Sequence, residues 1–343
     1  MQNMKEIAVI SGKGGTGKTS IVASFAALAS SIDSRQTRNA VLADCDVDAA
    51  DLHLLLAPTV LQREEFRCGH EAVILQENCI GCGACLARCR FGAVKRVEAA
   101  ETSGYVGDAG KACRQCDDGC SRACPSQFAE MIRAMRETCL TANREHFLID
   151  LTACGGCGVC VTQCPVKAID FPERVSGEWF ISETRFGPMV HAKLKPGGEN
   201  SGKLVSHVRE TARRIATERS ADFVLVDGPP GVGCAVIASI SGASKVLVVT
   251  EPTLSGAHDM ARVLELTRHF GIPTAVCVNK WDLNAEMTER IEAEARRLGA
   301  EVAGRVRYDR AVTAAQMHAR TVIETDTGPL SDDIRTVWES IRS

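Results

Sequence analysis

The sequence lacks the features that place proteins in membranes or on nucleic acids. No apolar run approaches the roughly 18 residues that span a bilayer, and the amino terminus, MQNMKEIAVISG, has neither the apolar core nor the cleavage site of a signal peptide. A formal net charge of −3 provides no basic excess for nonspecific nucleic-acid binding. Aromatic residues are scarce at 4%, but hydrophobic residues reach 45%, which is ordinary for a globular protein. We therefore expect a cytoplasmic protein with no nucleic-acid partner and no stable membrane insertion.

Cysteine is the residue that this sequence has in excess, with 17 among 343 residues. Disulfides are one explanation, but they suit short secreted chains better than a long chain without an export signal. Twelve of the cysteines form three tight groups between residues 79 and 164, and such clustering is typical of metal binding. The length allows two domains, or one large domain with an insert.

A nucleotide-binding pattern lies near the amino terminus. Residues 5–11 (KEIAVIS) predict a buried strand and residues 19–32 (TSIVASFAALASSI) an apolar helix, and the loop between them fits G-x-x-x-x-G-K-[ST]. Glycines let backbone N–H groups converge on phosphates at the helix amino terminus. Lys18 is expected to reach the β and γ phosphates, and Thr19 to ligate Mg²⁺. The predicted nucleotide-binding residues of this loop are Gly12, Lys13, Gly14, Gly15, Thr16, Gly17, Lys18, Thr19 and Ser20.

Lys13 makes the loop more informative, because a second lysine directly after the first glycine is the deviant Walker A pattern. The stretch SGKGGTGKTS resembles that of the MinD, ParA, Mrp and nitrogenase iron protein group of ATPases. In those families this lysine crosses a dimer interface to the partner's nucleotide. The resemblance therefore implies a homodimer in which Lys13 stabilises phosphoryl charge in trans, as an arginine finger does. An ordinary solvated lysine is the alternative.

Two further segments agree with the resemblance, and each places carboxylates at the end of a strand. In residues 40–56 (AVLADCDVDAADLHLLL), the resemblance implies that Asp46 orients the attacking water and that Asp44 lies near the metal. In residues 222–233 (DFVLVDGPPGVG), Asp227 matches the Walker B carboxylate that holds Mg²⁺ through water. Taken alone, each aspartate would also suit a helix cap or a turn.

Residues 275–283 (AVCVNKWDL) bear on the choice of nucleotide. They predict a strand followed by Asn279, Lys280 and Asp282. In GTPases an N-K-x-D sequence reads guanine, whereas the related dimeric ATPases use an asparagine here against adenine. Because the phosphate loop matches the ATPases better, we predict ATP with Mg²⁺, and GTP stays open.

Two of the cysteine groups follow C-x2-C-x2-C-x3-C, the bacterial ferredoxin run whose fourth cysteine ligates the other cluster when two are present. The spacing therefore predicts two [4Fe–4S] clusters. A zinc site of four thiolates is the alternative, but zinc sites usually use separated C-x-x-C pairs. The expected ligand sets are Cys79, Cys82, Cys85 and Cys164 for one cluster, and Cys154, Cys157, Cys160 and Cys89 for the other.

The third group departs from this pattern. Cys113, Cys116, Cys120 and Cys124 resemble the offset motif of multi-cluster electron-transfer subunits and predict a tentative third [4Fe–4S] cluster, with zinc or re-paired ligands as alternatives. With three motifs, spacing alone does not fix which fourth cysteine serves which cluster. Of the remaining cysteines, Cys45 and Cys277 lie in buried strand patterns, and we expect Cys234 to pack in the core, although a ligand shared across a dimer is conceivable; Cys68 and Cys139 have no assigned role.

The order of the motifs predicts an α/β fold, in which a parallel P-loop NTPase sheet is covered by helices on both faces. The cysteine region interrupts it as a small inserted α+β ferredoxin-like iron–sulfur domain. The expected ATPase domain is residues 1–60 plus 180–343, and the insert is residues 61–179, with extra cysteine-rich sequence at about 90–153. The final helix has apolar residues at helical spacing and is expected to pack in the core.

The resemblance implies an ATPase that couples nucleotide to iron–sulfur chemistry. As in the nitrogenase iron protein, ATP would switch a dimer and gate electron transfer to a redox partner. As in the Mrp group, ATP would instead help load or deliver a cluster or metal cofactor to an apo-metalloprotein. Electron transfer is favoured because a carrier must bind its cargo labilely. A ParA-like positioning switch with structural clusters is a third reading.

Overall fold

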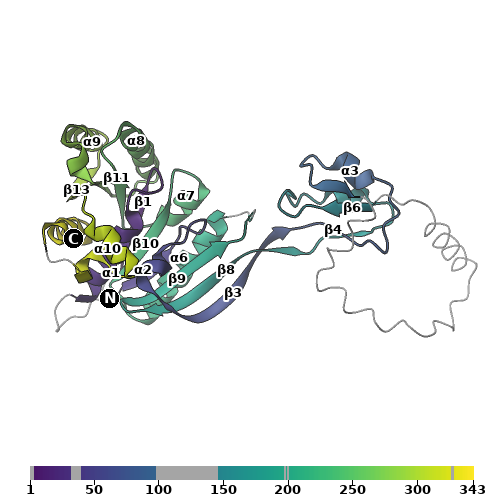
Figure 1. Cartoon of the computed structure of the whole chain (residues 1–343), viewed down its shortest axis with the longest axis horizontal. Coiled ribbons are helices and arrows are strands. Elements are labelled where there is room, and N and C mark those ends of the chain that lie inside the picture. Colours follow the sequence, from purple (N-terminus) through teal and green to yellow (C-terminus); the bar gives the residue numbers. More distant parts are fainter. Residues whose placement is uncertain (1–3, 32–39, 98–145, 197, 199–200, 326–327) are drawn as a thin grey trace, which may run out of the picture. The chain divides into compact units, whose positions relative to one another are not determined.

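The computed structural model describes residues 4–31, 40–97, 146–196, 198, 201–325 and 328–343 (Figure 1). The chain divides into two compact units: unit 1 is Met1–Phe66 with Val175–Ser343, and unit 2 is Arg67–Arg174. The chain leaves unit 1 within β3 (Thr59–His70) and returns within β8 (Glu173–Thr184). The boundaries expected near residues 60 and 180 therefore fall inside two strands, since the sequence gives no loop there.

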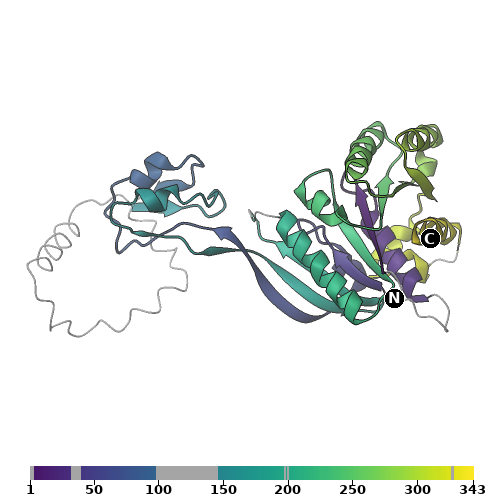
Figure 2. The ribbon, with the colours of Figure 1, turned by 180° about the vertical axis from the view of Figure 1, so that it is seen from behind.

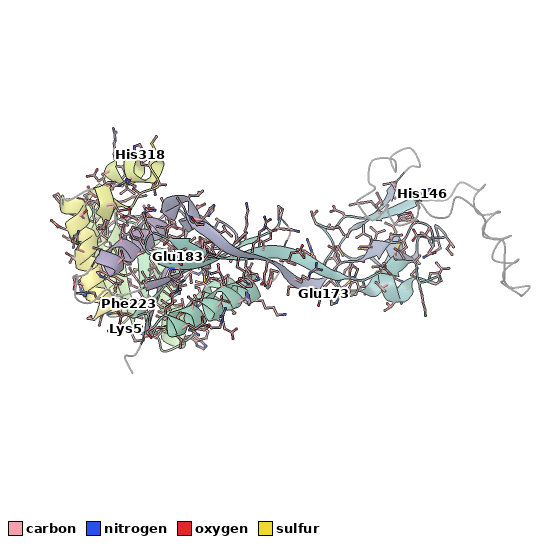
Figure 3. All side chains as sticks on the ribbon, turned by 90° about the horizontal axis from the view of Figure 1, so that it is seen from below. Lys5, His146, Glu173, Glu183, Phe223 and His318 are labelled. Atoms are coloured by element: carbon pink, nitrogen blue, oxygen red, sulfur yellow. The ribbon has the colours of Figure 1, made fainter. Side chains whose placement is uncertain are left out.

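Within the described residues, unit 1 is built on a sheet in which the order of strands is β13-β12-β11-β1-β10-β2-β9-β8-β3. The pairs from β13 to β9 are parallel, and β8 runs antiparallel to β9. Figure 3 labels Lys5 and Phe223, which are in register where β1 and β10 begin. The predicted parallel α/β sheet is confirmed. Its remaining strands are β1 (Lys5–Ser11), β2 (Ala40–Asp44), β9 (Gly187–Leu194), β10 (Phe223–Pro230), β11 (Lys245–Thr250), β12 (Thr274–Asn279) and β13 (Glu301–Val306).

Helices cover both faces of this sheet (Figure 1). The central strands are apolar on both sides because both sides are buried. One face carries α6 (Ser201–Glu218), α7 (Cys234–Ile240), α8 (Leu254–His269) and α9 (Ala285–Arg297). The other carries α1 (Lys18–Ser31), α2 (Leu52–Leu56), α10 (Ala311–Met317), α11 (Val322–Thr325) and α12 (Pro329–Arg342). Viewed from behind, the teal helix α6 lies over the sheet, where it packs on β2, β9 and β10 (Figure 2).

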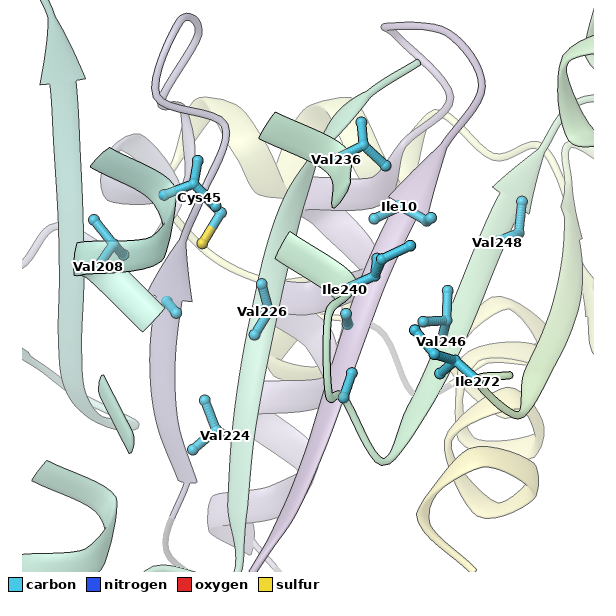
Figure 4. Packing of buried hydrophobic residues seen from close by; sticks show 14 of the residues in the cluster. Ile10, Cys45, Val208, Val224, Val226, Val236, Ile240, Val246, Val248 and Ile272 are labelled. Carbon is cyan, nitrogen blue, oxygen red and sulfur yellow. The ribbon is translucent and has the colours of Figure 1, made fainter. Parts of the chain in front are cut away.

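The two hydrophobic cores hold the strands whose ends carry the site. On one face, Val236 and Ile240 of α7 pack over Ile10 of β1 and Val226 of β10 (Figure 4). On the other face, the fully buried Trp338 of α12 packs with its ring 5.2 Å from that of Phe25 and 5.3 Å from that of Phe223. The expectation that the last helix packs in the core is confirmed. None of the described helices is long and apolar enough to cross a bilayer.

Unit 2 is small and internally repeated. The antiparallel pair β4 (Val73–Ile74) and β7 (Ile169–Asp170) accompanies a second pair, β5 (Val94–Val97) and β6 (His146–Ile149). Each ferredoxin-type run contributes one short helix, α3 (Ala84–Arg88) and α5 (Val159–Gln163), and these two helices pack together. The core is formed by Ala72, Cys85, Val94, Phe147 and Ile169.

Candidate functional site

The phosphate loop joins β1 to α1 through residues 12–17. Three glycines are needed for its path: Gly15 and Gly17 have φ values of +80° and +88°, and a Cβ at Gly12 would lie 2.3 Å from the Cβ of Asp259. Lys18 and Thr19 then open helix α1 and line a cavity of about 820 Å³ together with the loop. Backbone N–H groups at the start of a helix favour an anion there.

The carboxylates predicted to act with this loop belong to neighbouring strands: Asp44 ends β2, Asp46 follows it, and Asp227 lies within β10. β10 lies between β1 and β2, and Asp227 is in register with both Val9 and Asp44. The chain moves from β1 to β2 on one side and later to β11 on the other, so the loop lies at the switch point where open α/β sheets bind ligands. The Nζ of Lys18 lies 3.2 Å from Oδ2 of Asp46 and 3.9 Å from Oδ1 of Asp227.

Asp44 lies beneath these groups and is fully buried. Its two oxygens accept hydrogen bonds from the backbone N–H groups of Asp46 and Leu52, each at 3.2 Å. Burial and the neighbouring Asp227 raise the pKa of Asp44 well above its usual range. Its observed contacts thus fix the backbone between β2 and α2, which positions Asp46.

Asp227 is held in an environment that disfavours its charge. Burial raises its pKa to about 6 although Lys18 and the Thr19 hydroxyl oppose the shift, and neither of its carboxylate oxygens accepts a well-formed hydrogen bond within the described residues. Burial would lower the pKa of Lys18, but Asp227 and Asp46 raise it overall. Burial also raises the pKa of Asp46. One lysine therefore faces several buried carboxylates, and this donor set suits an additional hard cation such as Mg²⁺.

A second cavity of about 240 Å³ adjoins the first cavity, and both are lined by Gly15, Gly17, Ser20 and Gln316. Asn279 lines it and donates from Nδ2 to the backbone oxygen of Thr16 at 2.7 Å. Its other walls come from the segment after β13 and from α10, so it is suited to a flat group attached to phosphates held by the loop.

Asp282, the last residue of N-K-x-D, has a different role. It lies in the short 3₁₀ helix Trp281–Leu283, and its Oδ1 accepts a hydrogen bond from the backbone N–H of Tyr308 at 2.7 Å. Among the described residues that line the second cavity, Tyr308 is included and Asp282 is not.

Lys13 forms an ion pair with Glu251, a residue that the sequence analysis did not identify. Its Nζ lies 3.3 Å from Oε2 of Glu251 and donates to Oγ of Ser255 at 3.4 Å. Lys280 contacts the other oxygen of the same glutamate. The signal was present in the sequence, because Glu251 is a charged residue directly after the apolar strand β11.

In unit 2, the eight cysteines of the two ferredoxin-type runs line two separate cavities. Each cavity receives three cysteines from one run and the fourth cysteine from the other run. Gly83 and Gly158 precede α3 and α5 with a φ of +70° each, which turns the chain around each cavity. The sets are Cys79, Cys82, Cys85 and Cys164 in one cavity, and Cys154, Cys157, Cys160 and Cys89 in the other.

Backbone N–H groups form hydrogen bonds with the thiols of Cys89 and Cys164, the one cysteine that each run contributes to the other run's cavity. The N–H of Ala168 donates to Sγ of Cys164 at 3.2 Å. Burial raises the pKa of the Cys89 thiol, but backbone hydrogen bonds from residues 91–94 outweigh this effect and lower the pKa overall. Burial raises the pKa values of Cys85 and Cys160, and neighbouring thiols of the same run add to this. Among the described residues, no three His, Cys, Asp or Glu side chains are placed to hold one metal ion.

The remaining cysteines divide by location. Cys45 and Cys277 are fully buried, as predicted, and burial raises the pKa of Cys277 to about 12. The expectation that Cys234 packs in the core is wrong, because it is exposed and lines the main cavity at the start of α7. Cys68 lies half-buried in β3. The tentative third set, Cys113, Cys116, Cys120 and Cys124, lies outside the described residues, as does Cys139.

Comparison with known proteins agrees with this geometry. A family model described as the CobQ/CobB/MinD/ParA nucleotide binding domain matches residues 7–322. Uncharacterized protein MJ0578 of Methanocaldococcus jannaschii is 30% identical over 286 residues, which cover 81% of this chain and 79% of that protein. A second uncharacterized protein of that organism, MJ0579, is 24% identical over 284 residues and covers 83% of each chain.

Solved structures share the fold at low identity. The cell division ATPase MinD of Pyrococcus furiosus aligns with a TM-score of 0.52 at 14% identity and covers 99% of this chain and 98% of its own. The septum site-determining protein MinD of Pyrococcus horikoshii, solved as a complex with Mg-ADP, gives a TM-score of 0.52 at 12% identity, covering 99% and 96%. At such identities the likeness extends to the fold alone.

Proposed function

The chain belongs to the CobQ/CobB/MinD/ParA nucleotide binding domain family, and from that premise we propose that it is an ATP-hydrolysing iron–sulfur protein. Nucleotide-driven switching of a homodimer gates electron transfer through [4Fe–4S] clusters to a partner protein. One observation carries this proposal: a phosphate loop at a sheet's switch point and two sets of four cysteines, each around its own cavity, occur in a single chain.

The ATPase half uses residues at the ends of β1, β2 and β10. Loop N–H groups and Lys18 hold the β and γ phosphates, while Thr19 and Asp227 hold Mg²⁺, whose charge offsets that of the phosphates when it is bound. Buried Asp227 supports this, because Nζ of Lys18 lies 3.9 Å away and neither carboxylate oxygen accepts a well-formed hydrogen bond within the described residues, so its charge is only partly compensated. Asp46, held 3.2 Å from Lys18, orients the attacking water.

A second copy of the chain covers the nucleotide cavity in the ATP-bound state. Three exposed apolar side chains surround the loop: Leu54 is 59% exposed, Leu254 77% and Met317 81%. Leu54 lines the cavity, Leu254 precedes the Ser255 that Lys13 contacts, and Met317 follows a residue of the cavity wall. Exposed apolar groups around a charged site are typical of an interface. Across it, Lys13 acts on the partner's nucleotide.

The cysteine sets of unit 2 fit iron–sulfur clusters better than zinc. Zinc sites usually use separated C-x-x-C pairs, whereas these eight cysteines follow the ferredoxin run. Backbone N–H donors at Cys89 and Cys164 also suit a cluster, whose potential depends on hydrogen bonds to sulfur. When bound, such clusters supply one-electron transfer; a third cluster in the 113–124 group stays a prediction.

A second candidate function, ATP-dependent assembly or delivery of a cluster, is favoured by one observation. Cys234 is exposed and lines the nucleotide cavity, so nucleotide state could control access to its thiol. The electron-transfer proposal is preferred because each cysteine set of unit 2 combines ligands from two distant segments, which suits permanent binding.

The decisive experiment uses full-length protein purified without oxygen. Two clusters require about eight irons per chain and a third about twelve. The reduced protein is mixed with cytochrome c as a one-electron acceptor in the presence of Mg²⁺ with ATP, with ADP or without nucleotide. We expect the transfer rate to depend on ATP in the wild type and to lose that dependence in Lys18→Ala. Equal rates in all three conditions would contradict gating, and transfer of labelled iron to an apo-ferredoxin would favour delivery.

A further inference from the structure

Three strand ends meet beside the phosphate loop. β11 lies between β1 and β12 and is parallel to both. Glu251 directly follows β11, Lys13 follows β1 in the phosphate loop, and Lys280 directly follows β12. The order of strands in the sheet therefore places the carboxylate of Glu251 between the two lysines.

Glu251 uses both of its oxygens in this arrangement. Oε1 accepts from Nζ of Lys280 at 2.5 Å, and Oε2 lies 3.3 Å from Nζ of Lys13. The Glu251 side chain is 16% exposed, whereas those of Lys13 and Lys280 are 32% and 31% exposed. The two lysines lower the pKa of Glu251 against the effect of burial, so it is ionised at neutral pH. Ser255 gives Lys13 a second acceptor on the same subunit.

These contacts hold Lys13 in its own subunit. An ammonium group has three N–H donors, and the contacts with Glu251 and Ser255 direct two of them to its own subunit. The carboxylate also offsets part of the positive charge that a phosphate of the other subunit would receive. Extension of Lys13 to the partner's nucleotide therefore competes with the Glu251 contact, and the strength of that contact sets part of the docking equilibrium.

We propose that Glu251 is a positioning residue that restrains Lys13 in the free subunit and so opposes nucleotide-dependent dimerisation until a second nucleotide-loaded copy competes for the lysine. This inference rests on the proposed trans action of Lys13. Because Lys13 is partly exposed, the restraint is modest. Its removal is expected to tighten dimerisation by about threefold to tenfold.

The test compares isosteric variants of the full-length chain, prepared without oxygen. Dimerisation is measured by sedimentation velocity over a range of protein concentrations with Mg²⁺ and a non-hydrolysable ATP analogue, and ATPase rate per subunit is measured over the same range. Glu251→Gln should lower the half-maximal concentration in both assays, with the maximal rate changed less than about twofold. Ser255→Ala, which leaves Lys280 untouched, should act in the same direction more weakly. The control Glu301→Gln, which loses an ion pair with Lys245 at 2.9 Å elsewhere on unit 1, should change neither.

The double variant separates this role from a merely structural one. If Glu251 acts through Lys13, then adding Glu251→Gln to Lys13→Ala changes dimerisation no further. Tightening in the Lys13→Ala background, or unchanged or weaker dimerisation in both Glu251→Gln and Ser255→Ala, would overturn the inference. If Lys13→Ala itself retains the wild-type rate, the proposed trans lysine fails, whatever Glu251 does.

Discussion

Asp227→Asn is expected to stabilise the nucleotide-free protein, even though it removes a residue proposed to hold Mg²⁺. Asp227 is fully buried, its oxygens lack hydrogen bonds within the described residues, and burial raises its pKa from 3.8 to about 6. Since unfolding restores the ordinary pKa, ionised Asp227 destabilises the folded state by about 3 kcal/mol at neutral pH. Asparagine keeps the shape without the charge. Lys18 loses one carboxylate but keeps Asp46, so the expected net gain is about 1–2 kcal/mol.

The pH dependence gives this prediction its sign. The folded-state pKa of Asp227 is raised above the unfolded value, so the folded state binds the proton more tightly. The destabilisation is therefore complete above about pH 6 and disappears as the pH falls from about 6 toward about 4. The free energy of unfolding of Asp227→Asn should exceed that of the wild type most at about pH 7.5 and much less at about pH 5.

Urea unfolding followed by tryptophan fluorescence measures the difference in the free energy of unfolding between the variant and the wild type, and it reports on unit 1. All three tryptophans, Trp179, Trp281 and Trp338, belong to unit 1. Saturating Mg²⁺ and ATP should reverse the ranking, because only the wild type gains the full stabilisation from binding. The reasoning is refuted if Asp227→Asn is less stable than the wild type without nucleotide, or if their difference is the same at both pH values.

Three further predictions follow from single side chains. Lys18→Ala should abolish measurable nucleotide binding in a filter-binding assay and also destabilise unit 1, because it leaves Asp46 and Asp227 without their shared cation; retained ATP affinity would contradict the assignment. Cys85→Ser should remove about four irons per chain, whereas Cys277→Ala, in the core of unit 1, should retain them all. Trp338→Ala should lower the free energy of unfolding by about 3–5 kcal/mol, because a fully buried ring is lost; a change below about 1 kcal/mol would mean that α12 packs differently.

The parallel sheet could be predicted from sequence because strand and helix patterns alternate along unit 1, and each buried strand is apolar on both faces. The places of Lys18, Asp46 and Asp227 followed from the same logic, since the carboxyl ends of parallel strands share one edge. The roles of these residues, like the cluster ligands and the domain limits, stay predictions. The expected domain boundaries near residues 60 and 180 fall inside β3 and β8. A change in amino-acid composition shows where the cysteine-rich sequence begins, but it does not show where a strand ends.

Other features depended on contacts between segments far apart in the chain. Glu251 belongs to no recognised motif, and only the sheet order places it between Lys13 and Lys280. Cys234 follows the predicted switch segment after Asp227 and was expected to pack in the core, yet it opens the seven-residue helix α7 and lines the main cavity. Neither residue lies in a periodic pattern strong enough to fix its direction, and in both cases the position is decided by packing of neighbouring elements.

The N-K-x-D sequence is present in this chain, but its last residue, Asp282, has a structural contact instead of lining the second cavity. A guanine-reading aspartate must present its carboxylate to the base, but Asp282 accepts the backbone N–H of Tyr308. Asn279, in contrast, lines the second cavity. We therefore expect ATP to bind at least about tenfold tighter than GTP, measured by displacement of a fluorescent ATP analogue. Asp282→Ala should weaken both nucleotides alike, through the segment that carries Tyr308. If it weakens GTP selectively, then Asp282 reads guanine and the adenine assignment is wrong.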